Sequence, residues 1–187
     1  MNRGKWVKYR YRDGVNEITG DEMEQLVKLA TQVGEKLKEN GQTVTTAESC
    51  TGGGIAYILT EVAGSSAWFE RGFVTYSNEA KHDLVGVSTA TLEAYGAVSQ
   101  QVVAEMATGA LEAAKADFAL AVSGIAGPTG GTEEKPVGLV CFGWATRNGV
   151  VTEKCLFDGD RHDIRRNTIA HSLCRLLSYL ESEKPEQ

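Results

Sequence analysis

Apolar residues along the chain follow helical spacing in several segments. Leu26, Val33 and Leu37 share one face of a predicted helix that ends at Asn40-Gly41, and Thr19-Gly-Asp-Glu22 before it has the form of a capping box. Ser99 precedes a longer amphipathic stretch. Shorter helices are predicted after the glycines at 52–54, where the pattern stops near Ala63-Gly64, and at 78–86 and 89–95. A last amphipathic helix follows Arg161.

Runs rich in β-branched or aromatic residues lie between these helices and predict strands at 43–46, 72–77, 117–123, 137–146 and 150–157. The run 117–123 is almost entirely apolar, which is typical of a strand covered on both faces. Asn148-Gly149 between the last two runs indicates a hairpin. The pattern therefore predicts an α/β protein whose sheet is mixed.

Two glycine-rich loops follow predicted strands, one at Gly52, Gly53 and Gly54 and one spanning 124–131. If both strands are parallel, both loops lie at the carboxyl edge of the sheet, where α/β proteins place their sites. Ser49 or Cys50 would then be a nucleophile beside backbone N–H donors. The alternative is a tight turn that needs glycine for its positive φ angle.

Composition limits the classes of function. The chain has 187 residues, 42% hydrophobic and 24% charged, a formal net charge of −6, and no apolar run long enough to cross a membrane. Nucleic acid is therefore not an expected partner. The four cysteines lie far apart without a C-x-x-C pair, and the first thirty residues lack a signal-peptide core, so we expect a cytoplasmic protein with reduced thiols and no bound metal or cofactor.

The first residues differ from the rest because basic and aromatic residues alternate there. We expect a basic arm at 1–20, one domain at 21–181 and a charged tail at 182–187. The interleaving is compatible with single-stranded nucleic acid, but terminal segments are commonly loose or lie at an edge, and no nucleic-acid-binding motif follows.

Candidate chemical groups include Lys81 in the first turn of a predicted helix, where the helix dipole disfavours a cation and lowers the pKa of the amine. The alternative is an ordinary exposed lysine. Arg161 is either an anion ligand or the partner of a neighbouring aspartate, and Cys50 is either a nucleophile or a small buried thiol. The three histidines follow no metal-binding or catalytic spacing.

Several blocks carry a resemblance in their order along the chain. They are Thr46-Ala-Glu-Ser-Cys-Thr-Gly-Gly53, Gly72-Phe-Val-Thr-Tyr-Ser-Asn-Glu-Ala-Lys81, Gly96-Ala-Val-Ser99, Ser123-Gly-Ile-Ala-Gly-Pro128, Lys135-Pro-Val-Gly138 and Gly159-Asp-Arg161. Over roughly residues 21–181 the chain resembles the CinA carboxy-terminal domain family, and in particular its stand-alone nicotinamide-nucleotide amidohydrolases. The resemblance implies a three-layer α/β/α sandwich with a mixed, mostly parallel sheet, and a homo-oligomer, expected to be a dimer.

The resemblance also implies hydrolysis of the carboxamide of nicotinamide mononucleotide to nicotinate mononucleotide and ammonia, without a metal. Ser49 would be the nucleophile and Lys81 its base, with Tyr76 in the same catalytic site. Substrate-binding positions would be Glu48, Cys50, Thr51, Gly52, Gly53, Ser123, Gly124 and Arg161. Either the loop 124–131 or Arg161 would hold the phosphate. The alternative function is a catalytically silent relative that binds a nucleotide or a protein partner, although such a copy should have lost part of the Ser49, Tyr76 and Lys81 set.

Overall fold

The computed structural model describes residues 22–182. The predicted arm, most of the capping box and all but the first residue of the predicted tail lie outside this range, so those expectations stay predictions. The elements are α1 (Glu22–Asn40), β1 (Val44–Glu48), α2 (Gly54–Thr60), η1 (Ser65–Ala67), β2 (Phe69–Val74), α3 (Asn78–Val85), α4 (Thr89–Tyr95), α5 (Gln100–Ala114), β3 (Phe118–Gly124), β4 (Leu139–Thr146), β5 (Gly149–Leu156) and α6 (Arg161–Ser182).

The strands form one sheet in the order β2-β1-β3-β4-β5. Both neighbours of β1 run parallel to it, whereas β4 pairs antiparallel with β3 and with β5. The predicted hairpin is present, since β4 and β5 are joined through Arg147 and Asn148. These pairings confirm a mixed sheet in which every strand except β4 points the same way.

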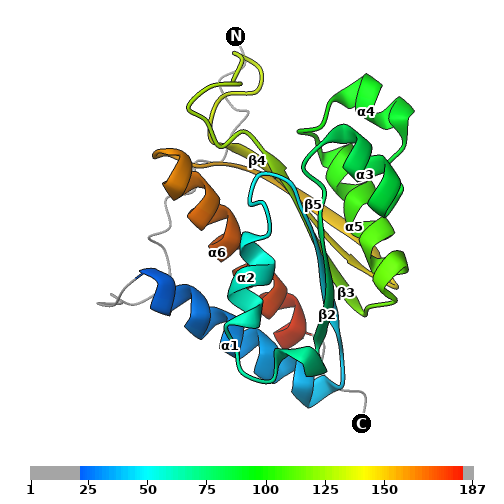
Figure 1. Cartoon of the computed structure of the whole chain (residues 1–187), viewed down its shortest axis with the longest axis vertical. Coiled ribbons are helices and arrows are strands. Elements are labelled where there is room, and N and C mark those ends of the chain that lie inside the picture. Colours follow the sequence, from blue (N-terminus) through cyan, green and yellow to red (C-terminus); the bar gives the residue numbers. More distant parts are fainter. Residues whose placement is uncertain (1–21, 183–187) are drawn as a thin grey trace.

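Helices cover both faces of the sheet, which confirms three layers (Figure 1). One core lies between the sheet and α1, α2 and α6, and the other lies between the sheet and α3, α4 and α5. Strand β3 is buried on both sides, with Leu120 and Val122 facing the first core and Ala119 and Ala121 facing the second. The small residues on the second face let α5 pack close to the sheet.

The boundaries of two elements differ by about three residues from the sequence expectation, more than those of the others. Strand β2 begins at Phe69 and ends at Val74, earlier than 72–77, because its parallel pairing with β1 starts at Phe69 opposite Val44. Helix α2 ends at Thr60, where the hydrogen bonding tightens and the N–H of Val62 donates to the carbonyl of Leu59 three residues back. Neither shift changes the edge of the sheet at which the strands meet the glycine loops.

None of the helices within residues 22–182 combines the length and the apolar character needed to span a bilayer.

Candidate active site

Ser49 and Lys81 come from different elements and meet at the carboxyl edge of the sheet. Ser49 directly follows β1, and its N–H donates to the carbonyl of Val122 on β3 at 3.0 Å, which fixes it to the sheet. Lys81 lies one turn into α3, whose N-terminus is capped by the hydroxyl of Ser77. The Nζ atom of Lys81 is 3.1 Å from the Oγ atom of Ser49, within reach for proton transfer.

The amine of Lys81 is buried, with only 1% of the residue exposed. Its other hydrogen-bond partners are the backbone carbonyls of Thr75 at 2.9 Å, Tyr76 at 3.3 Å and Ser77 at 3.5 Å. Burial lowers the pKa of Lys81 from its ordinary value because the charged form loses its hydration. A neutral amine can donate two hydrogens to carbonyls and accept the hydroxyl hydrogen of Ser49 with its lone pair.

The turn after Ser49 supplies candidate oxyanion donors, with one correction. Gly52 and Gly53 have φ angles of 60° and 94°, the left-handed conformation that favours glycine. The N–H of Gly52, predicted to face the substrate, instead donates to the carbonyl of Ser49 at 3.0 Å and closes the turn. Within residues 22–182 no acceptor of a hydrogen bond is found for the N–H groups of Cys50, Thr51 and Gly53, so these are the donors that can serve a substrate oxygen.

Glu48 lies beside the nucleophile, but its carboxylate points toward the start of α2 and not toward a substrate. One oxygen accepts from the hydroxyl of Thr51 at 2.6 Å and from the N–H of Ile55 at 2.9 Å, and the other accepts from the N–H of Ala56 at 2.8 Å. Such contacts satisfy the free N–H groups of a helix N-terminus and complement its dipole. Glu48 and Thr51 therefore hold the nucleophile turn onto α2, and the substrate contacts expected of them stay a prediction.

The thiol of Cys50 is buried, and burial raises its pKa to about 12. It is therefore protonated at neutral pH, and a protonated thiol is a poor nucleophile. Of the two readings of Cys50 that the sequence leaves open, the geometry favours a small buried side chain.

Tyr76 and Ser123 occupy the same edge but differ in accessibility. The side chain of Tyr76 is at the surface, with the residue 61% exposed, while its carbonyl contacts Lys81. Ser123 is 1% exposed, and its hydroxyl donates to the carbonyl of Ala97 at 2.8 Å, which ties the loop before α5 to the sheet. Gly124 follows, and a Cβ atom there would lie 2.8 Å from the carbonyl oxygen of Leu139, so only glycine fits.

Arg161, at the first residue of α6, contacts the second glycine loop. Its guanidinium donates to the carbonyl of Gly127 at 2.9 Å, so neither predicted aspartate is its partner. Arg161 and the loop 124–131, which the sequence left as alternatives for the phosphate, are therefore in contact with each other. Arg165, one turn later, was missed by the sequence analysis, although the four-residue spacing of two arginines was a usable signal. Its guanidinium donates to the carbonyl of Thr51 at 2.8 Å and so touches the nucleophile turn.

A separate hollow of about 620 Å³ lies beside the start of α5 and strands β4 and β5, lined by residues such as Tyr95, Ser99, Lys135 and Lys154. Neither Ser49 nor Lys81 lines it. Because the serine and the buried amine are the groups able to form and break bonds, we place the candidate active site at Ser49 and not in this hollow.

An α/β fold with a serine hydroxyl against a buried lysine at the glycine-loop edge has the arrangement of a serine–lysine hydrolase. Comparison with known proteins gives the family. The model of the CinA C-terminal domain matches residues 26–180, and the chain belongs to this family. Three relatives illustrate how close the match is.

The chain is 59% identical, over 150 residues, to the nicotinamide-nucleotide amidohydrolase PncC of Escherichia coli strain K12, a match that covers 80% of this chain and 91% of that protein. It is 52% identical to PncC of Pseudomonas putida over 155 residues, covering 83% and 97% of the two chains. The crystal structure of the competence/damage inducible protein CihA from Agrobacterium tumefaciens superposes with a TM-score of 0.81 at 46% identity, covering 89% of this chain and all of that one.

Proposed function

We propose that this chain hydrolyses the carboxamide of nicotinamide mononucleotide to nicotinate mononucleotide and ammonia, with Ser49 as nucleophile and Lys81 as its base. The activity is that named for its PncC relatives, which match nearly their whole length. The observation that carries the mechanism is the 3.1 Å contact between the Lys81 amine, 1% exposed, and the Ser49 hydroxyl.

In the first half-reaction, Oγ of Ser49 attacks the carboxamide carbon while the neutral amine of Lys81 takes the hydroxyl proton. The carbonyl oxygen becomes an oxyanion that the N–H groups of Cys50, Thr51 and Gly53 are available to bind, each such donor contributing roughly 3 kcal/mol. The bond from carbon to nitrogen then breaks, and the Lys81 ammonium returns its proton to the leaving amide nitrogen, which departs as ammonia. An ester of nicotinate mononucleotide on Ser49 remains.

In the second half-reaction, water attacks this ester and Lys81 takes a proton from the water. Collapse of the tetrahedral intermediate breaks the bond to Oγ, Ser49 regains its proton from Lys81, and the carboxylate product leaves. Lysine acts in both steps because its lowered pKa lets it lose and regain one proton near neutral pH.

The substrate has an aromatic ring at one end and a phosphate at the other, and the site offers a counterpart for each. Tyr76 is an exposed aromatic ring at the edge that holds Ser49, and we propose that it covers the pyridine ring. The phosphate would bind where Arg161 meets the loop at Gly127, since a guanidinium and free loop N–H groups favour an anion. Ser123 and Gly124 shape the wall between the two ends.

The test is ammonia release from nicotinamide mononucleotide by the purified chain, with nicotinate mononucleotide identified as the second product. Ser49→Ala should lower the rate by at least about 10³-fold, because the nucleophile is removed. Cys50→Ala is the matched control next to it in the chain and should keep most of the wild-type rate. An inactive wild type with intact fold would leave the silent binding protein as the correct interpretation, and full activity of Ser49→Ala would exclude the mechanism.

Two further expectations belong to this proposal. None of the thiols of Cys50, Cys141, Cys155 and Cys174 forms a disulfide, and we propose a cytoplasmic enzyme of nucleotide recycling. The structure is that of a single chain, so the expected homodimer stays a prediction.

A further inference from the structure

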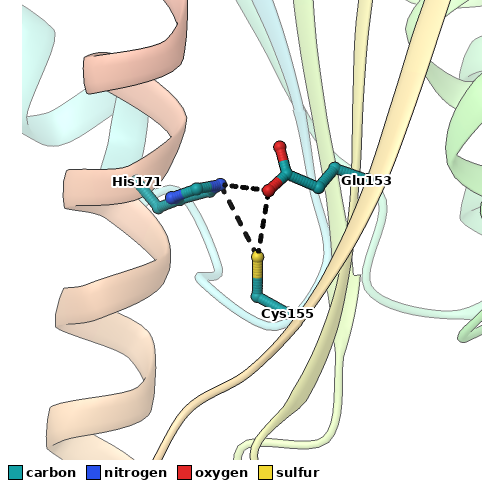
Figure 2. A group of neighbouring side chains, drawn as sticks. All are labelled: Glu153, Cys155 and His171. Atoms are coloured by element: carbon teal, nitrogen blue, oxygen red, sulfur yellow. Dashed lines mark hydrogen bonds and ion pairs between the residues drawn. The ribbon is translucent and has the colours of Figure 1, made fainter. Parts of the chain in front are cut away.

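Glu153, Cys155 and His171 gather on the side of the sheet away from α5, outside the site at Ser49. Glu153 and Cys155 alternate along β5 and so point to the same face, and His171 projects from α6 toward them (Figure 2). The sequence analysis expected no metal ligands because it searched for closely spaced histidine and cysteine motifs. The signal it missed is a Glu-x-Cys pair on a strand.

The three polar atoms of this group lie at nearly equal separations. The Sγ atom of Cys155 is 3.6 Å from Oε1 of Glu153 and 3.6 Å from Nε2 of His171, and the nitrogen and oxygen are 3.5 Å apart. An N–H···O hydrogen bond is normally about 2.7–3.2 Å long, so the nitrogen of His171 and the oxygen of Glu153 are too far apart for a good one.

The same triangle fits one face of a tetrahedral zinc site. Zinc binds sulfur at about 2.3 Å and nitrogen or oxygen at about 2.0–2.2 Å, so tetrahedral angles place sulfur about 3.5 Å from the other two ligands. The same angles place nitrogen about 3.4 Å from oxygen. All three separations here lie within about 0.2 Å of those values. One ion beside this triangle would therefore reach all three ligand atoms at ordinary bond lengths.

The chemistry of the three side chains suits a divalent ion. The imidazole of a histidine is the commonest nitrogen ligand of metals in proteins, and Nε2 of His171 faces the other two side chains. Its ring is fixed by aromatic contacts, with the centroid of Phe142 at 4.8 Å. A thiolate and a carboxylate balance two positive charges, and the set of one sulfur, one nitrogen and one oxygen favours zinc over magnesium or calcium.

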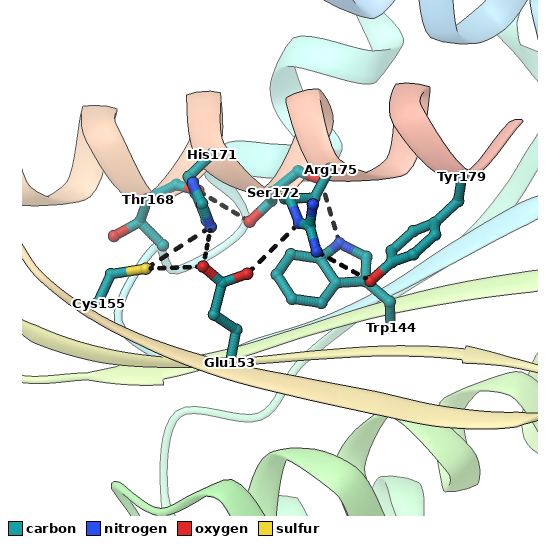
Figure 3. Close-up of polar contacts among 8 residues, drawn as sticks. All are labelled: Trp144, Glu153, Cys155, Thr168, His171, Ser172, Arg175 and Tyr179. Atoms are coloured by element: carbon teal, nitrogen blue, oxygen red, sulfur yellow. Dashed lines mark hydrogen bonds and ion pairs between the residues drawn. The ribbon is translucent and has the colours of Figure 1, made fainter. Parts of the chain in front are cut away.

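The second oxygen of Glu153 already has a partner. Nε of Arg175 lies 3.4 Å from Oε2, and Figure 3 shows the arginine on the opposite side of the carboxylate from Cys155. A metal on Oε1 therefore leaves this ion pair in place, as outer partners of ligating carboxylates commonly do. The side chain of Glu153 is 23% exposed and lies on an edge strand, so this ligand is the one nearest to solvent.

We propose that Glu153, Cys155 and His171 form a zinc-binding site that joins β5 to α6, separate from the amidohydrolase site. When the ion binds, the Cys155 thiol gives its proton to solvent and the thiolate forms the bond to the metal. The site is structural: it fastens the edge strand to the last helix, and it takes no part in the reaction at Ser49.

The test uses cobalt as a spectroscopic substitute for zinc, because a cobalt–thiolate bond gives a charge-transfer band in the near ultraviolet. Titrating the chelator-treated chain with Co²⁺ should develop this band up to one equivalent, release one proton per ion near neutral pH, and lose the band when Zn²⁺ is added. At a zinc concentration 100 times the dissociation constant, the melting temperature should rise by roughly 5–10 °C.

Cys155→Ser should abolish the band, and Glu153→Gln and His171→Gln should each weaken cobalt binding at least about tenfold. Cys174→Ser is the matched control, since this thiol lies on α6 three residues from His171 and should not matter. If Cys155→Ser does not fold, the proposal is tested with Glu153→Gln, because the Glu153 side chain is partly exposed and its replacement should disturb the fold less. Absence of the band in the wild type, or a band and a zinc-induced melting shift unchanged in the Glu153 and Cys155 variants, would overturn the proposal.

Discussion

Gly109 on α5 holds the lysine-bearing helix in place, and Gly109→Ala tests whether that placement matters. A Cβ atom at position 109 would lie 1.7 Å from the carbonyl oxygen of Val85, the last residue of α3. Contacts shorter than 3.0 Å do not occur, so the two helices must separate by about 1.3 Å, the difference between 3.0 and 1.7 Å. Lys81 lies one turn before Val85 on the same short helix and moves with it.

The expected magnitude follows from that shift. The distance from Nζ of Lys81 to Oγ of Ser49, 3.1 Å, would grow to as much as about 4.4 Å, beyond hydrogen-bond reach. A misplacement of about 1 Å at reacting groups costs on the order of 10²-fold in rate, or about 2.7 kcal/mol of barrier. Overpacking should also lower the free energy of unfolding by about 1–3 kcal/mol.

The assay compares kcat/KM for ammonia release with the melting temperature of each variant. Gly34→Ala is the matched control, because its Cβ would lie 2.6 Å from the ring of Trp68 on the other face of the sheet, away from Lys81. It should lower the melting temperature yet keep kcat/KM. A Gly109→Ala protein that is equally destabilised but has unchanged kcat/KM would refute the reasoning that α3 must hold Lys81 against Ser49.

Three further predictions concern single side chains. Glu48→Gln removes the negative charge of a carboxylate that accepts three hydrogen bonds. The free energy of unfolding should fall by about 2–3 kcal/mol and the melting temperature by about 4–12 °C. An unchanged melting temperature would contradict the capping role of Glu48. Lys81→Met should abolish activity and raise the melting temperature at pH 7, since it removes a buried amine. Because the pKa of Lys81 is lower in the folded than in the unfolded chain, the free energy of unfolding of the wild type should rise with pH from the folded pKa up to 10.5. Thermal melts between pH 7 and 10 should therefore show a decreasing difference in melting temperature between Lys81→Met and the wild type. Tyr76→Phe should retain activity and Tyr76→Ala should raise KM, as steady-state kinetics would show; equal KM values would exclude ring contact with the substrate.

Much of the fold could be predicted because short sequence patterns specify local structures that the folded protein keeps. The hairpin turn at Asn148-Gly149, the cap at Ser77 and the all-apolar strand before Ser123 each specify their structure within a few residues. The start of β2 was less predictable, because its first residues pair with β1 through a parallel register that no short window of sequence encodes.

The candidate site, too, was predictable from the sequence only in part. A serine before a glycine turn and a lysine after a helix cap are visible locally, and their meeting requires only that β1 and β2 be parallel neighbours. The direction in which a side chain points is not local. Glu48 turns back to α2, Ser123 binds a distant loop, and Arg165 reaches the nucleophile turn from the other end of the chain.

The most direct test of the serine–lysine pair is the titration of Lys81 itself, followed by NMR of its ¹³C-labelled ε-carbon alongside kcat/KM. We predict that the signal assigned by Lys81→Met titrates below the ordinary value of 10.5, and that kcat/KM rises with pH around the same midpoint, because only the neutral amine accepts the Ser49 proton. A Lys81 signal that titrates at or above 10.5 while kcat/KM is already at its plateau near neutral pH would contradict the mechanism.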